Sequence, residues 1–125
     1  MAGNEQLSKQ ELREKAIKKE FNRLKRTFKN FDLDKKRLAA AEGLMQESAF
    51  MRVTLEELKK DITENGAVDE MSQGEYTIMR ESPAAKTYNT MIQRYTTVNK
   101  ELFNLLPKDK PKPEDDGFES FVNAK

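Results

Sequence analysis

The carboxylate side chains of this sequence are the first candidates for chemistry, because adjacent acids can supply oxygen ligands to a divalent cation. No glycine-punctuated calcium loop surrounds any of the adjacent pairs, and no third fixed ligand accompanies them. We therefore expect no metal and no cofactor. The three pairs are Glu56-Glu57, Asp69-Glu70 and Asp115-Asp116.

The residue types that enzymes most often use for proton transfer and nucleophilic attack are missing. The chain contains no His and no Cys. Serine–histidine and cysteine–histidine catalysis are therefore excluded, as are disulfides and cysteine-based zinc sites. No glycine-rich phosphate loop occurs, so the sequence offers no nucleotide site. Carboxylate-based hydrolysis is compatible with the composition, but we expect a protein that is not an enzyme.

Basic residues are concentrated near the N-terminus. The whole chain has 23 Lys+Arg and 22 Asp+Glu, a formal net charge of +1, which excludes a globally basic nucleic-acid coat. Residues 1–31 alone hold nine basic and four acidic residues, whereas residues 67–82 hold one basic and four acidic. The near-neutral total therefore hides a basic N-terminal segment and an acidic segment in the middle of the chain.

Residues 8–31 are predicted to form one amphipathic helix. Ser8 followed by Glu11 fits a capping box, and apolar residues recur at helical spacing from Ile17 to Phe31. At ~100° per residue, six basic residues fall on the opposite side within an arc of ~120°. We call these six residues the basic stripe: Lys15, Lys18, Lys19, Lys25, Arg26 and Lys29.

The basic stripe is the candidate DNA-binding site. A rigid helix that presents several cations on one face can neutralise several phosphates at once. The alternative is a solvated outer face, because exposed lysine also serves solubility. Only Glu11 interrupts the sector, which slightly favours phosphate binding.

Residues 35–64 are predicted to form a second helix, capped by Asp32 or Asp34 and ended by Asn65-Gly66. Its apolar residues fall on more than one face, so we expect it to pack on two sides. A restart near Val53 is the alternative to one continuous helix, because Thr54 and Glu57 repeat the capping-box spacing. One apolar stripe holds Ala40, Leu44, Met51, Leu55, Leu58 and Ile62; a second patch holds Leu38, Ala41, Met45 and Ala49; Phe50 and Val53 lie outside both.

The segment after Gly66 changes character. Residues 67–79 favour a small β-hairpin with a turn at residues 72–74 over a plain loop. A third helix is predicted from Ser82-Pro83 to Pro107, because Ser caps, Pro suits the first turn and a later Pro ends the helix. Its apolar face holds Ala85, Tyr88, Ile92, Tyr95, Leu102, Phe103 and Leu106.

The last segment of the chain differs from the helical part. Three of the four prolines lie between residues 107 and 113 in the sequence, with alternating charges around them, which predicts a disordered linker. A short motif follows that either docks on another protein or folds back on the core. Its apolar residues are Phe118, Phe121 and Val122. We divide the chain into a basic N-terminal helix (1–31), a helix–hairpin–helix core (32–107) and a linker with a short peptide motif (108–125).

Composition favours a mainly α fold with three long helices. Nearly half of the 125 residues are Ala, Glu, Lys, Leu or Arg, which is typical of long helices. A chain this short with 36% hydrophobic residues has little capacity to bury a core alone, so we expect partner subunits. No apolar run approaches the ~20 residues that span a bilayer, and residues 1–10 lack the apolar segment of a signal peptide. These features predict a cytoplasmic protein that has no membrane partner.

Two segments on either side of the predicted hairpin carry a family resemblance. Residues 54–66 have the sequence TLEELKKDITENG, and residues 81–95 have the sequence ESPAAKTYNTMIQRY. The Ser-Pro-Ala helix start followed by Tyr-Asn-Thr-Met-Ile is the specific part. Over about residues 35–107, the chain resembles the small subunit of tailed-phage terminases, in the branch common in phages of Gram-positive hosts.

The resemblance implies a function in packaging the viral genome during virion assembly. Members form rings of about eight to eleven subunits, bind double-stranded viral DNA in the host cytoplasm, and recruit and regulate the large subunit that holds the ATPase and nuclease. By the same analogy, Phe118, Phe121 and Val122 dock on the large subunit. No clean helix-turn-helix is found, so we assign backbone contacts with DNA to the basic stripe. The main alternative is a helical scaffold or adaptor that assembles without binding DNA, and a dimeric DNA-binding regulator is a further one.

Overall fold

The computed structural model describes residues 7–107 of the chain as three helices and one hairpin. The helices are α2 (Lys9–Phe28), α3 (Lys35–Asn65) and α4 (Pro83–Asn104), and strands β1 (Val68–Gln73) and β2 (Tyr76–Glu81) lie between the second and third helices. The predicted mainly α fold with a hairpin in this position is confirmed. Within these residues, no helix is both long and apolar enough to cross a membrane.

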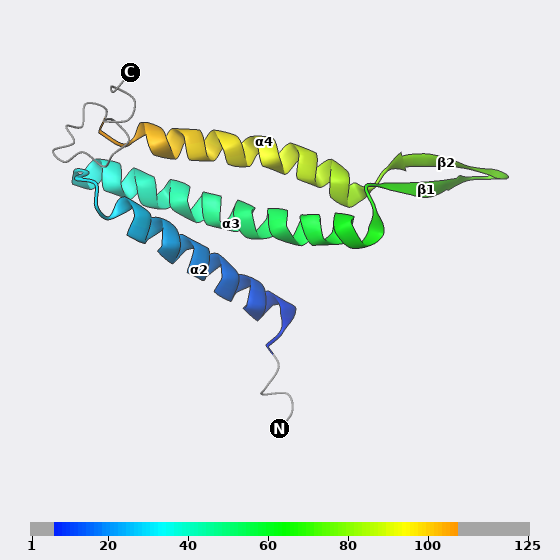
Figure 1. Ribbon diagram of the computed structural model, residues 1–125, viewed down its shortest axis with the longest axis horizontal. Helices are drawn as coiled ribbons and strands as arrows, with labels where there is room; N and C mark the ends of the chain where they lie inside the picture. The colour runs from blue at the N-terminus through cyan, green and yellow to red at the C-terminus, as the bar shows by residue number, and fades with distance from the viewer. Residues whose placement is uncertain (1–6, 108–125) are drawn as a thin grey trace, which may run out of the picture.

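Helix α3 is central, and α2 and α4 both pack against it. Helices α3 and α4 run antiparallel along their length, and α2 packs on α3 and diverges from it toward its own N-terminus (Figure 1). The antiparallel hairpin extends beyond the far end of the α3–α4 pair (Figure 1). The second helix therefore packs on two sides, as its apolar pattern predicts.

Local capping explains where the helices begin. The Ser8 side chain accepts a hydrogen bond from the Glu11 amide at 3.0 Å and the Glu11 carboxylate accepts from the Ser8 amide at 2.9 Å, which confirms the capping box. Asp34, and not Asp32, caps α3, and Ser82 caps α4. Gly66 closes α3 with a φ of 92°, a left-handed conformation that glycine adopts without steric cost.

Two predicted boundaries are wrong by a few residues, and the alternative of a restart within the second helix does not occur. Helix α2 ends at Phe28, and Phe31 follows a turn. Helix α3 continues through Val53 without a restart, because the Thr54 hydroxyl donates to the Phe50 carbonyl at 2.9 Å inside the helix and does not cap a new one. The hairpin turn lies one residue later than predicted, since Gln73 pairs with Tyr76 in the sheet register.

The core lies at the end of the molecule where all three helices meet. Its buried members are Leu24 and Phe28 of α2, Ala41 and Met45 of α3, and Leu102 of α4. Three members of the second apolar patch of α3 are fully buried: Ala41, Met45 and Ala49. In the first apolar stripe, only Leu55 is fully buried.

Two residues of the predicted apolar pattern behave differently in the structure. Val53 lies outside both predicted patches yet is only 7% exposed, because α2 and α4 cover adjoining faces of α3. Phe103 belongs to the predicted apolar face of the third helix but is 60% exposed. Its neighbour Leu102 takes the core position, and consecutive helical residues point ~100° apart. The Phe103 ring lies at the edge of the core, 5.9 Å from the Phe28 ring.

Candidate nucleic-acid interface

All six side chains of the basic stripe are exposed; five lie on α2, and Lys29 follows directly as the cap of its C-terminal end. The opposite face of this helix packs against α3 and α4 through Leu24 and Phe28, so the stripe lies on the solvent side. Three of its members lie at the edge of that side, beside α3: Lys19, Lys25 and Arg26. Four of its members line one open cleft on the outer surface of α2, with a volume of about 560 Å³. We call it the outer cleft, and its cations are Lys15, Lys18, Lys19 and Arg26.

The other two members of the stripe lie beside a second cleft near the C-terminal end of α2. This cleft has a volume of about 320 Å³, and we call it the terminal cleft. Its basic residues are Lys25, Arg26 and Lys29, and its apolar residues are Phe28, Phe31, Leu33 and Leu38. Arg26 belongs to both clefts, so the six cations form one continuous surface.

Lys25 differs from the other five members of the stripe. Its ammonium lies 3.8 Å from the Glu42 carboxylate and 5.5 Å from the centre of the Phe21 ring. Within residues 7–107, the remaining five cations form no ion pair. An exposed ion pair is worth only ~0–1 kcal/mol, so Lys25 can still exchange partners. The other five need not break an ion pair to bind a phosphate.

Arg23 is a further basic residue of α2 and lies outside the basic stripe. Its guanidinium donates two hydrogen bonds to the Glu20 carboxylate, at 2.9 and 2.6 Å. These hydrogen bonds, helped by the positive charges of Arg23 and Arg52, hold the pKa of Glu20 below its usual range, against the opposing effect of burial. Arg23 is therefore neutralised within its own helix. The ion pair between Glu20 and Arg23 could have been predicted from sequence, because residues three apart are neighbours on the surface of a helix.

Arg13 is also committed to the structure of the protein. Its guanidinium donates to the Glu57 carboxylate at 3.0 and 3.1 Å and to the Thr54 hydroxyl, and it lies 4.9 Å above the centre of the Phe50 ring. These contacts join the diverging N-terminal half of α2 to α3. The long-range pairing could not be predicted from sequence, because it depends on where α2 crosses α3.

Ion pairs occupy three of the carboxylates that the sequence offers as metal ligands. Glu57 is bound by Arg13, Glu56 lies 3.2 Å from Arg52, and Asp69 lies 2.9 Å from Arg80. In the part of the chain that the structure describes, no group of three or more acidic residues is placed to hold a metal ion. The Asp115-Asp116 pair lies outside the described residues, as do Phe118, Phe121 and Val122 of the predicted partner-binding motif.

The hairpin provides a second surface with unpartnered side chains. The register places Met71, Tyr76 and Ile78 on one face and Val68 and Met79 on the other. Tyr76 is 65% exposed, and the other four side chains are exposed or half-buried. A two-stranded hairpin is at best marginally stable alone. The projecting hairpin is therefore a candidate contact surface for another protein chain.

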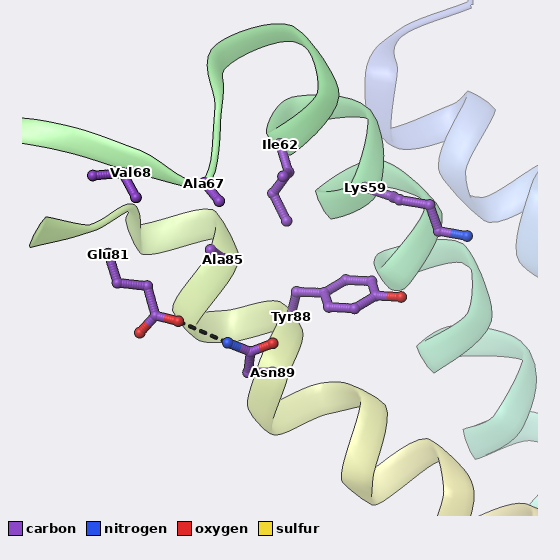
Figure 2. A pocket seen from close by; sticks show the side chains of 8 residues that line it. All are labelled: Lys59, Ile62, Ala67, Val68, Glu81, Ala85, Tyr88 and Asn89. Atoms are coloured by element: carbon purple, nitrogen blue, oxygen red, sulfur yellow. Dashed lines mark hydrogen bonds between the residues drawn. The ribbon is translucent and has the colours of Figure 1, made fainter.

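A cleft of about 550 Å³ lies at the base of this hairpin (Figure 2). Ile62 of α3 and Ala85 of α4 contribute apolar surface, and the Tyr88 side chain extends toward α3 (Figure 2). Two of its polar side chains are hydrogen-bonded to each other, since the Asn89 amide of α4 donates to the Glu81 carboxylate of β2 at 2.7 Å. The cleft thus offers packing surface and brings together no set of groups for acid–base chemistry.

Comparison of the chain with protein-family models, with curated proteins and with solved structures gives no match in any of the three.

Proposed function

We propose that this protein is the small subunit of a viral DNA-packaging terminase and acts in the host cytoplasm during virion assembly. Its basic stripe binds the backbone of double-stranded viral DNA, and the protein recruits and regulates the large ATPase and nuclease subunit. The main observation in favour of DNA binding is that five cations of the stripe are exposed and form no ion pair within residues 7–107. The resemblance over residues 35–107 supports the choice of terminase among DNA-binding functions.

The dimensions of the stripe suit a DNA backbone. From Lys15 to Lys29 the helix rises about 21 Å, at 1.5 Å per residue. DNA advances about 3.4 Å per base pair, so this length spans about six base pairs. The stripe lies on the outer surface of a packed helix, and no recognition helix accompanies it within the described residues, so we propose that its cations contact phosphates and that binding has little sequence preference.

Self-association is the second part of the proposal. A single subunit leaves exposed apolar side chains on both faces of the hairpin and an open cleft at its base. Burial of such surface against neighbouring copies would stabilise a homo-oligomer, and a head-to-tail contact that closes gives a ring. In a ring, each copy would add one basic stripe to a larger DNA-binding surface.

Native mass spectrometry of the full chain, with and without a DNA duplex, tests this function. We expect one assembly of about eight to eleven subunits that retains DNA. Addition of the large subunit from the same source should give a complex with an altered ATPase rate. A monomer that binds neither DNA nor the large subunit would refute the proposal.

A helical scaffold or adaptor that binds proteins but not DNA is the second candidate. The observation that favours it is the location of exposed apolar residues such as Tyr76 and Met79 on the hairpin, outside the stripe. An assembly of defined size whose DNA affinity does not change when the stripe is neutralised would support this candidate over the first.

A further inference from the structure

The terminal cleft is an apolar site with a basic rim. Phe28, only 3% exposed, forms part of its lining, while Phe31 and Leu38 are 37% and 42% exposed. Its volume of about 320 Å³ is at the lower end of typical ligand pockets. An apolar side chain that entered the cleft would cover these exposed groups. The chemistry of an occupant is therefore apolar, with negative charge nearby to face the basic rim.

The charges on the rim are unequal. Arg26 and Lys29 form no ion pair with any residue that the structure describes, whereas Lys25 is paired with Glu42 at 3.8 Å. The four charged residues of the rim are Lys25, Arg26, Lys29 and Glu42, and together they carry an excess of two positive charges. An acidic segment would thus be attracted to the rim chiefly through Arg26 and Lys29.

The described chain ends beside this cleft. The Phe103 ring near the end of α4 lies 5.9 Å from the ring of Phe28, which lines the cleft. Leu105 and Leu106 pack on the same core cluster as Leu33, another lining residue. Eleven residues lead from position 108 to Phe118, and at ~3.3 Å per residue they can span up to about 36 Å. Residues 114–122 can therefore reach the terminal cleft of their own subunit.

Residues 114–122 have the composition that the cleft requires. Their sequence, EDDGFESFV, contains four carboxylates and no basic residue, together with two phenylalanines and one valine. Because this segment is covalently linked to the subunit, its effective concentration at a nearby site reaches the millimolar range, which favours it over a peptide from another molecule.

We propose that residues 114–122 dock in the terminal cleft of the same subunit. A phenylalanine ring, from Phe118 or Phe121, enters the apolar part of the cleft, and the flanking carboxylates face Arg26 and Lys29. Docking covers half of the basic stripe, so the tail and DNA compete for these cations. This competition rests on the proposed function, whereas the docking itself does not.

Zero-length carboxyl–amine cross-linking of the full natural chain tests the docking in the absence of DNA. We expect links from Glu114, Asp115, Asp116 or Glu119 to Lys29 and Lys25, in clear excess over links to Lys15 and Lys18. The latter two are matched controls, because they are exposed lysines of the same helix outside the terminal cleft. An even distribution over the four lysines would overturn the proposal. So would links that join isotopically light and heavy copies in a mixed sample, because the occupant would then be the tail of a second copy.

A tail variant tests the part played by the aromatic rings. Phe118→Ala combined with Phe121→Ala should weaken docking by at least about tenfold, because the free energy gained by burying an aromatic ring is lost. The cross-link yield at short reaction times should fall by a similar factor. Ser120→Ala is the matched control and should leave the yield unchanged. A double variant that cross-links as well as the natural chain would overturn the proposal. The outcome is separate from that for DNA binding, since docking can be observed whether or not the stripe binds DNA.

Discussion

Neutralising the outer cleft should flatten the salt dependence of DNA binding. The proposed variant replaces the four cations that line this cleft with glutamine and leaves the two other stripe residues in place. A control variant replaces four exposed cations of α3 and α4, also three lysines and one arginine, so that both variants change the formal net charge from +1 to −3. The outer-cleft variant carries Lys15→Gln, Lys18→Gln, Lys19→Gln and Arg26→Gln; the control carries Lys60→Gln, Lys86→Gln, Arg94→Gln and Lys100→Gln.

The magnitude follows from the number of phosphates contacted. Each neutralised phosphate contributes about −0.9 to the slope of log K against log salt concentration. Six contacts per subunit give a slope of about −5, so affinity falls about 10³-fold between 50 and 200 mM salt. With two contacts left, the slope is about −2 and the same change in salt lowers affinity only about tenfold.

Fluorescence anisotropy with a labelled duplex, repeated over this range of salt, measures both slopes. Native mass spectrometry must first show that the three proteins have the same subunit number, because contacts are counted per subunit. If the outer-cleft variant keeps the slope of the natural chain, the stripe serves solvation and not DNA binding. If the control variant loses as much slope, net charge and not the position of the cations governs the affinity.

Three further perturbations test other parts of the structure. Phe28→Ala should lower the free energy of unfolding by about 3–5 kcal/mol in urea denaturation, because it leaves a cavity where all three helices meet; a loss below about 1 kcal/mol would contradict this core assignment. The hydrogen bonds from Arg23 lower the pKa of Glu20 in the folded state, so their contribution to stability is present above the unfolded pKa and is lost as the pH falls below about 4.5 through the folded pKa. Stability measured against pH should therefore fall less steeply in that range for Glu20→Gln than for the natural chain, and parallel curves would rule out this linkage. Ile78→Asp should reduce the subunit number seen by native mass spectrometry more than Thr77→Asp does, because Ile78 shares its face of the hairpin with Met71 and Tyr76; equal effects would show that this face contributes no more than the other to the assembly.

Features that depend on the local backbone were predictable. The capping box at Ser8, the left-handed closure at Gly66 and the start of α4 at Ser82 each depend on hydrogen bonds between residues close in sequence. The basic stripe was predictable for a similar reason, because the helical period alone brings its members to one side of α2.

Some local features of the sequence are compatible with two structures. Thr54 lies at a capping-box spacing from Glu57, but its hydroxyl bonds to the carbonyl of the preceding turn, as threonine can within a helix. Phe103 has the apolar character of a core residue, yet Leu102 occupies the core because the rotation of α4 against α2 and α3 selects it. Hydrophobicity marks candidates for burial, and the packing of neighbouring elements selects among them.

The helices, the hairpin and the sector of α2 on which the cations lie all follow from local patterns in the sequence. By contrast, the pairing of Arg13 with Glu57, the position of Lys25 near Glu42 and the apolar cleft beside the end of α4 depend on how the helices pack. The physical reason is the range of the interactions. Caps and helical faces follow from bonds and rotations within a few residues, whereas ion pairs and clefts between helices follow from the crossing of elements that are far apart along the chain.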